Sequence, residues 1–421
     1  MAQLSHSAEN LQTLLYIAED YSLRERYDIQ ATKSAVLIYG NKLKKHQQVK
    51  WQIREKDIPE ETAAKHLGIT RDISNRAPVD ERLCRARNMF YALMGVGLHG
   101  ENGLNPVASL NILQVYIVPA VLHGLETLVM SDTEIHKLEI FYRKVLRQIQ
   151  GLPDRVGGPA IYILAGVLPI EGLLHLRILA LLGNICRDTE SLEHQIGKRQ
   201  ILMRGITDSS WFSYGKRILT KYSLPSIHDL FDVRPAKNLW KTEATNAVWQ
   251  YWNAEMAYSI KSLSSLRYLN HDQYEDRKPH QVWTAVNTTL HDLKRATIKA
   301  KLITGTYRLQ ANRARFNQHL VNATCLMCKA EAEDRYHFLT QCTKTADLRE
   351  SYTAALRIIL TEMGEDLQLL KDDRTRLQII LDCTKVFGGR DKDYLSRIEA
   401  NSRYLCWALH LRREKSQMET T

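Results

Sequence analysis

Hydrophobic residues recur along most of this chain with the spacing of amphipathic α-helices. From Pro78 onward, apolar positions repeat almost everywhere at steps of three and four residues. The clearest helix begins at Ser131, where Ser-Asp-Thr-Glu predicts a capping box with Glu134 as its third helical residue. Gly151 and Pro153 are expected to end this helix. The pattern therefore predicts a mainly α-helical protein.

The first 75 residues have a mixed pattern. A helical pattern around residues 11–18 is followed by a strand-like run, residues 35–39, which ends at the turn-forming pair Gly40-Asn41. We therefore expect a small α/β segment at the start of the mainly helical fold. Breaks in the pattern divide the chain into five predicted segments: 1–75, 76–190, 191–290, 291–345 and 346–421.

Composition narrows the class of protein. Hydrophobic residues make up 44% of the chain and charged residues 25%, which argues against wholesale disorder and fibrous architecture. The seven cysteines are few and odd in number, so we expect an intracellular protein, nuclear or cytoplasmic, rather than a disulfide-stapled secreted one.

Two stretches, residues 112–130 and 161–185, are apolar enough to be considered as membrane spans. Both contain charged residues, including Glu126 and Arg177, and each charge at mid-span costs roughly 2.5 to 3.5 kcal/mol. We therefore interpret both stretches as core helices and predict no membrane partner.

The charge balance favours a polyanionic partner. The chain has 58 lysines and arginines against 47 acids, a formal net charge of +11. Residues 294–315 are the most biased segment, with seven basic residues and no acid. We predict that RNA or DNA binds there, and the expected contacts are Lys294, Arg295, Lys299, Lys301, Tyr307, Arg308, Arg313 and Arg315.

Tyr307 in this segment and Phe316 directly after it are the rings available for base stacking. The alternative for the segment is a solvated helix face. A second basic stretch, residues 42–56, is better explained as a solvated hairpin.

A cysteine and histidine cluster follows the basic segment. Cys325 and Cys328 are separated by two residues, and His337 and Cys342 follow within 18 residues of Cys325. Two thiolates from such a turn, with a histidine and a third cysteine, can complete a tetrahedral zinc site. Because all four ligands come from the protein, we predict structural zinc rather than a catalytic metal. The alternative is a group of buried thiols beside a core histidine. The other cysteines are predicted to be core residues: Cys84, Cys186, Cys383 and Cys406.

The order of several short motifs resembles a known family. These are residues 4–12 (LSHSAENLQ), 31–34 (ATKS), 65–69 (KHLGI), 91–95 (YALMG), 99–106 (HGENGLNP), 116–126, 302–307 (LITGTY) and the CCHC cluster with 337–339 (HFL). Together they resemble the C-terminal part of the reverse-transcriptase polyprotein of non-LTR (LINE-type) retrotransposons. The resemblance spans residues 1 to about 345.

This resemblance implies an architecture and a set of partners. Residues 1–75 would be the end of a polymerase palm, 76–190 a helical thumb and 191–290 a connector to the zinc-binding segment. Lys33 has a position similar to that of the family's lysine that assists the leaving pyrophosphate, with Gln30 where asparagine is common. Without the resemblance, Lys33 would be an ordinary exposed lysine. The partners implied are RNA and DNA, and the compartment implied is the nucleus.

The catalytic aspartates of that family are missing from this chain. Its Tyr-x-Asp-Asp motif would lie just before Ala2, and Mg²⁺ would be needed only with an intact palm. The only adjacent aspartate pair is Asp372-Asp373, which fits the start of a solvated helix. We therefore expect a catalytically incomplete fragment that binds nucleic acid. The alternatives are part of an active RNA-directed DNA polymerase whose palm is missing here, or a zinc-stabilised protein-interaction scaffold.

Overall fold

The computed structural model describes residues 2–39, 50–73, 78–100, 103–287, 289–315 and 321–418. The predicted turn at Gly40-Asn41, most of the basic stretch at 42–56 and the ring of Phe316 lie outside these residues. The fold is mainly helical with a small α/β part at the N-terminus, which confirms the predicted fold class.

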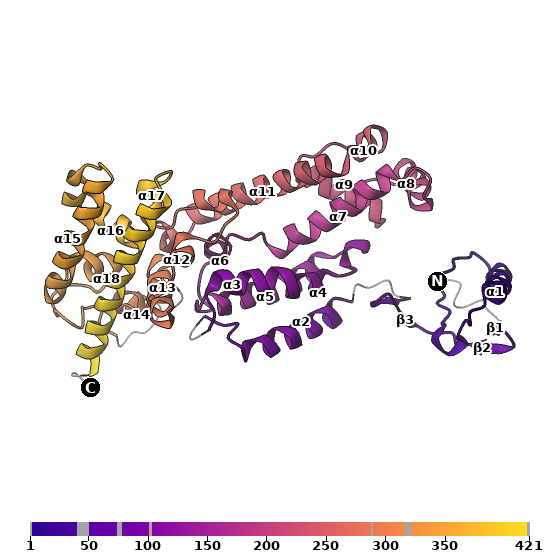
Figure 1. Ribbon diagram of the computed structural model, residues 1–421, viewed down its shortest axis with the longest axis horizontal. Helices are drawn as coiled ribbons and strands as arrows, with labels where there is room; N and C mark the ends of the chain where they lie inside the picture. The colour runs from indigo at the N-terminus through magenta and orange to yellow at the C-terminus, as the bar shows by residue number, and fades with distance from the viewer. Residues whose placement is uncertain are drawn as a thin grey trace. The chain divides into compact units, whose positions relative to one another are not determined.

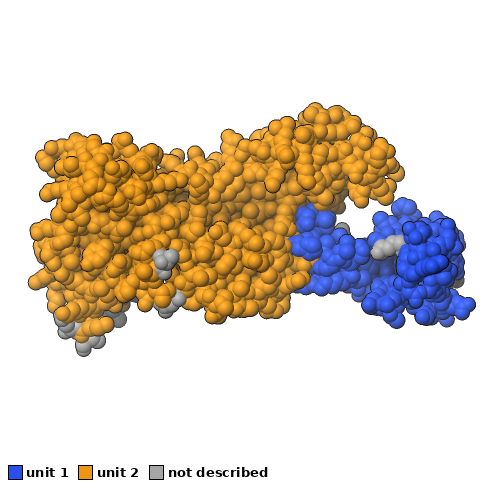
Figure 2. Space-filling model, viewed as in Figure 1, with its two compact units in different colours: residues 1–81, 123–128 blue, residues 82–122, 129–421 orange. Residues whose placement is uncertain are grey.

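The chain forms two compact units (Figure 2). Unit 1 contains residues 1–81 and 123–128, and unit 2 contains residues 82–122 and 129–421. The boundaries predicted at 190, 290 and 345 fall inside unit 2 and stay predictions.

Unit 1 is built on helix α1 (Ala8–Arg24) and the hairpin of β1 (Trp51–Ile53) and β2 (Lys56–Ile58). The helix starts at Ser7, whose side chain accepts a hydrogen bond from the Asn10 N–H. Its core is a small apolar cluster comprising Ala31, Val36, Trp51, Ile53 and Ile58.

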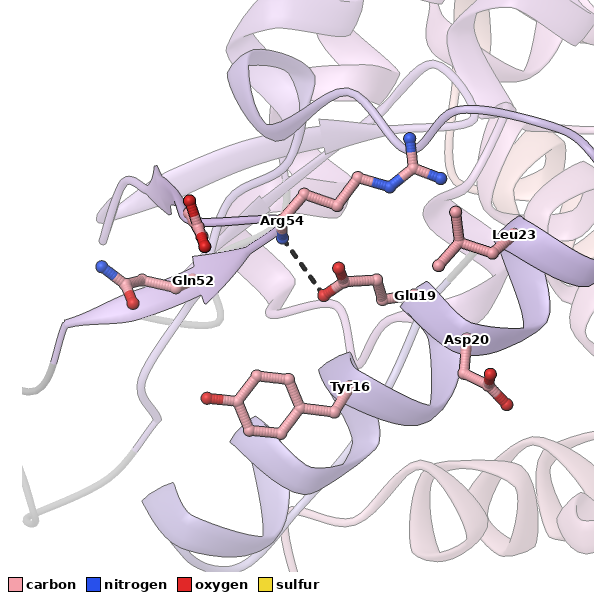
Figure 3. A pocket seen from close by; sticks show the side chains of 7 residues that line it. Tyr16, Glu19, Asp20, Leu23, Gln52 and Arg54 are labelled. Carbon is pink, nitrogen blue, oxygen red and sulfur yellow. Dashed lines mark hydrogen bonds between the residues drawn. The ribbon is translucent and has the colours of Figure 1, made fainter.

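Side chains of α1 cover the free edge of β1. The Gln12 amide donates to the Gln52 carbonyl at 2.8 Å and accepts from the Gln52 N–H at 3.2 Å. The Glu19 carboxylate accepts the Arg54 N–H at 3.1 Å, inside a surface pocket also lined by Tyr16 and Asp20 (Figure 3). Because these backbone groups are already paired, the edge is closed to a further strand.

The prediction of a strand at residues 35–39 is wrong. This run is reduced to one parallel bridge, in which Val36 donates to the Pro59 carbonyl and accepts from the Glu61 N–H. Pro59 has no N–H, so the ladder cannot extend from Val36 back toward Ser34.

A second hairpin in unit 1 joins β3 (Ala63–His66) to β4 (Ile69–Asp72). Leu67 and Gly68 make the turn, both at positive φ, which suits glycine and strains leucine. The short helix η4 (Leu125–Thr127) belongs to the same unit, because the His123 ring contacts the Leu67 carbonyl at 3.3 Å.

The first half of unit 2 is a set of packed helices (Figure 1). Helix α5 has the predicted capping box, since the Ser131 side chain accepts the Glu134 N–H and Glu134 accepts the Ser131 N–H. The helices of this half are α2 (Val79–Met94), α3 (Pro106–Ile112), the π turn η3 (Leu113–Ile117), α4 (Val118–Leu122), α5 (Asp132–Ile149), α6 (Gly158–Ala165) and α7 (Ile170–Arg187).

Helix α7 is the centre of a second group. The long helix α11 (Lys237–Lys261) lies along it, and the Trp240 indole donates to the Leu179 carbonyl at 2.8 Å. Gly183 makes this approach possible, because a Cβ there would lie 2.3 Å from the indole. The helices α8 (Leu192–Met203), α9 (Trp211–Lys221) and α10 (Ile227–Val233) complete the group.

The rest of unit 2 holds the basic segment and the cysteine cluster. The longest helix, α18 (Lys392–Met418), packs against α13 (Leu290–Ile303) and α15 (Ala346–Glu362). The remaining elements are η5 (Ser264–Leu266), η6 (Asp272–Asp276), α12 (Gln281–Thr284), α14 (Gln310–Arg315), the π turn η7 (His337–Gln341), η8 (Thr343–Thr345), η9 (Leu367–Lys371), α16 (Asp373–Leu381) and α17 (Thr384–Phe387).

Within the described residues, no helix by itself has the length and apolar composition needed to cross a membrane. Helices α6 and α7 have the required length and apolar composition only when taken together, and the chain bends by 60° at the break between them.

Candidate metal centre

The four residues of the CCHC cluster converge. One ligand atom from each of Cys325, Cys328, His337 and Cys342 lies within 4.8 Å of all the others. The Cys325 and Cys342 sulfurs are 3.9 Å apart, and the Cys328 sulfur is 3.2 Å from His337 Nε2. Ligands bonded at about 2.0–2.3 Å around one tetrahedral ion would have similar separations. The cluster can therefore hold a metal ion, as the spacing of these residues predicted.

The first two ligands come from a tight turn. The Lys329 N–H donates to the Cys325 carbonyl at 2.9 Å, and Lys329 has a positive φ of 57°. The Cys325 N–H donates to the Glu331 carbonyl at 2.7 Å, so the chain folds back on itself. This local geometry turns the two cysteines toward one point.

The other two ligands come from the π turn η7. Residues five apart on an α-helix lie roughly 140° apart around its axis, since each residue turns the helix about 100°. Here the Cys342 N–H instead donates to the His337 carbonyl, five residues back, at 2.9 Å. The wider turn brings His337 and Cys342 to one side, and π turns are frequent at functional sites.

Burial and backbone hydrogen bonds together set the pKa values of the three thiols. Desolvation raises the pKa of Cys325 to about 12 and also raises the pKa of Cys342. Cys328 is more exposed. Desolvation raises the pKa of its thiol, but hydrogen bonds from the backbone N–H groups of Ala330 and Glu331 outweigh this and lower the pKa to about 7. Since metals bind thiolates, a cation would displace protons from the two buried thiols.

The structure corrects one assignment among the other cysteines. Cys186, Cys383 and Cys406 are buried, but Cys84 is exposed on α2, so its predicted core position is wrong. Among the described residues, the CCHC group is the one set of histidine, cysteine or carboxylate ligands that converges in this way.

Most of the predicted nucleic-acid contacts reach the surface. Lys294, Arg308, Arg313 and Arg315 are exposed. The other two accessible residues, Arg295 and Lys301, are half-buried, and the Arg295 guanidinium lies 5.3 Å from the centre of the Tyr404 ring.

Two predicted contacts are wrong because their side chains are buried. Lys299 has no exposed surface, and its ammonium group lies 2.6 Å from a Glu399 carboxylate oxygen. Tyr307 is 6% exposed, stacks on Phe338 and shares a 2.8 Å hydrogen bond with His410. Neither side chain is available to a nucleic acid. Their partners lie far away along the chain, which is why sequence reasoning missed the burial.

Two residues between the second and third ligands connect the cluster to the basic segment. The Glu333 carboxylate accepts the Gln310 N–H at 2.9 Å, at the start of α14, and a bidentate bond from Arg413 at 2.7 and 2.9 Å. The Arg335 guanidinium donates to the Leu302 and Ile303 carbonyls at 3.2 and 3.1 Å, at the end of α13. The loop that carries the ligands thus caps both basic helices. Sequence reasoning missed Glu333 and Arg335, and no local pattern marks them.

The residues that the resemblance connects with polymerase chemistry are an exposed lysine and two aspartates at the start of a helix. Lys33 is exposed at the end of the short helix η1 (Ala31–Lys33). Asp372 is the N-cap of α16 and accepts the Thr375 N–H at 2.9 Å, while Asp373 pairs with Arg376. The two aspartates therefore begin a helix, as predicted.

No known protein family, curated protein or solved structure matches the chain.

Proposed function

We propose that this chain binds RNA or DNA through its basic segment, residues 294–315, and that a structural zinc ion at the CCHC cluster holds this segment in place. The observation that carries the proposal is the pair of contacts made by Glu333 and Arg335. These residues belong to the metal loop and cap the two basic helices.

Zinc is favoured by the chemistry of the ligands. Three thiolates and one imidazole form a closed set of four converging donors, and Zn²⁺ prefers such sets in structural sites. The alternative is a group of protonated thiols beside a core histidine, and the convergence of four ligand atoms on one point favours the metal over it.

A nucleic acid is favoured by the charge and shape of the segment. Arg308, Arg313 and Arg315 are exposed within eight residues, and guanidinium groups bind phosphate with two parallel hydrogen bonds. Phosphate contacts orient a protein on the backbone without reading sequence. We therefore expect binding that depends on salt and varies little with base sequence.

We also propose, from the motif resemblance, that the chain represents the C-terminal portion of a non-LTR reverse-transcriptase polyprotein. Polymerisation by the chain itself is not part of this proposal, because its adjacent aspartates cap and pair within α16.

The test is binding of the full chain to fluorescent single-stranded RNA and DNA over a range of salt concentrations. Arg313→Glu with Arg315→Glu should weaken binding by about tenfold or more at low salt and flatten the salt dependence by roughly one to two units of slope. The matched control is Arg357→Glu with Lys371→Glu, which changes charge equally at exposed positions elsewhere in unit 2.

Equal binding by both double variants would show that these arginines are not the contact surface. A wild-type chain that binds neither nucleic acid at low salt would overturn the proposal in favour of a protein-interaction scaffold. Zinc content, measured on the same samples, should be the same in all of them.

A further inference from the structure

Glu331 contacts three of the four residues of the metal centre. Its carbonyl accepts the Cys325 N–H at 2.7 Å, and its own N–H bonds to the Cys328 thiol. Its carboxylate oxygen Oε2 lies 3.0 Å from His337 Nδ1. The residue is thus fixed by the ligand turn while its side chain reaches the histidine from the other half of the site.

The two ring nitrogens of His337 have different neighbours. Nδ1 faces the Glu331 carboxylate, and Nε2 lies 3.2 Å from the Cys328 sulfur, inside the cluster. A neutral imidazole has one N–H and one lone pair. A carboxylate accepts hydrogen bonds and cannot donate one when ionised, so the proton of the ring belongs on Nδ1 and the lone pair on Nε2.

We propose that Glu331 is a positioning residue, which holds His337 as the Nδ1–H tautomer with Nε2 directed at the cation. This inference rests on the metal site of the proposed function. A carboxylate behind a ligating histidine orients the ring and makes it a stronger ligand. Glu331 itself does not join the converging ligand set, because its carboxylate lies behind the ring.

The effect on metal affinity should be moderate. Loss of such an outer partner typically weakens metal binding by about 10- to 100-fold. The Glu331 side chain is 64% exposed, so water competes for its carboxylate and the lower end of this range applies. We expect about a tenfold loss of metal affinity in Glu331→Ala. The loss should be smaller in Glu331→Gln, because its amide oxygen can still accept a hydrogen bond from the Nδ1–H group.

The experiment uses the full chain and Co²⁺ as a spectroscopic probe, followed by Zn²⁺ competition against a chelator. The variants are Glu331→Ala, Glu331→Gln and the control Glu350→Ala, which removes an exposed carboxylate from α15. Nitrogen-15 NMR of the zinc-loaded chain reports the tautomer of His337. We expect a slowly exchanging Nδ1 proton in the wild type and Glu331→Gln, and rapid exchange in Glu331→Ala.

The possible results distinguish the role of Glu331 from the existence of the metal site. A wild-type chain without tetrahedral Co²⁺ bands would overturn the metal site, and the role of Glu331 with it. Normal bands in the wild type, with equal Zn²⁺ affinity and Nδ1 exchange in Glu331→Ala, would overturn the role of Glu331 alone. If Glu331→Ala does not fold, the decision comes from Glu331→Gln: retained Nδ1 protection with a small affinity loss supports the inference, and an Nε2–H tautomer overturns it.

Discussion

The CCHC cluster and the pair of His280 and Asp382 are two buried polar sites in unit 2 that differ in how their polar atoms are satisfied. His280 and Asp382 are both almost fully buried, and the His280 Nε2 lies 3.1 Å from Asp382 Oδ2. The same oxygen accepts the Asn270 N–H, and Oδ1 accepts the N–H and hydroxyl of Thr384. Each oxygen of this carboxylate therefore has two donors.

The CCHC cluster has no such closed set. Its sulfurs and ring nitrogen contact one another at 3.9 and 3.2 Å, so their lone pairs converge on one point. Buried polar groups in folded proteins are normally paired, and a convergent set of lone pairs is paired best by a cation. The His337 ring nitrogens face a sulfur and a carboxylate, so His337 belongs to a set that could hold a metal ion. The His280 ring instead accepts the Val282 N–H and faces Asp382, so it belongs to a closed hydrogen-bond network.

Loss of the metal should have the largest effect. Cys342→Ser is expected to lose zinc and to unfold the loop that carries Glu333 and Arg335, because structural zinc contributes on the order of 10 kcal/mol to local folding. Metal analysis and thermal unfolding with and without a chelator measure both effects. The control is Cys84→Ser, an exposed cysteine outside the cluster. Retention of one metal ion per chain by Cys342→Ser would contradict the ligand assignment.

Breaking the closed network should have the next largest effect. Asp382→Ala leaves buried donors of Asn270, His280 and Thr384 without an acceptor, so we expect a loss of about 3–5 kcal/mol in the free energy of unfolding. Urea unfolding measures the loss. Zinc content should be unchanged, and a variant that loses metal as well would show that the two sites are not independent.

A third prediction concerns the pH dependence of stability. His175 is buried between Tyr214 and Tyr222, and desolvation, with the nearby Lys221 charge, lowers its pKa from 6.5 to about 3. Between these values the unfolded chain binds the proton and the folded chain does not, so stability falls as the pH is lowered below about 6.5. The expected contribution is at most about 1.4 kcal/mol per pH unit.

The measurement is urea unfolding at pH 7, 6 and 5 for the wild type and His175→Gln. Other groups also contribute to the slope, so the difference between the two slopes isolates His175. Equal slopes would mean that this histidine is protonated in the folded chain.

The smallest effect is expected at a buried cysteine outside the cluster. Cys406→Ala removes one sulfur from the core beside Lys299 and Glu399, and should reduce the free energy of unfolding by about 1 kcal/mol without changing zinc content. Thermal unfolding and metal analysis test this together. A fall in zinc content would mean that burial alone does not distinguish core thiols from ligands.

Sequence reasoning worked best where the interactions were local. The capping box at Ser131 needs only residues up to Glu134, and the structure has it. The CCHC cluster could be predicted for the same reason, because its ligands lie within 18 residues and both halves are short turns.

Sequence reasoning failed where a residue far away along the chain decided whether a side chain is buried. Lys299 was assigned to the surface because basic residues surround it, yet Glu399, 100 residues later, makes its burial possible. Tyr307 is covered by His410 in the same way. The run at 35–39 keeps one bridge, between Val36 and Glu60, whose partner segment lies more than 20 residues away along the chain.

The amino-acid order alone therefore determined the helical character of this protein, the capped starts of α5 and α16, and the group of four residues that could hold a metal ion, because each depends on neighbours within a few turns of chain. The tertiary structure decided which positive charges reach the solvent and that Glu333 and Arg335 tie the metal loop to the basic helices. Those properties depend on burial and on pairing between segments up to a hundred residues apart, and neither is written in a local pattern.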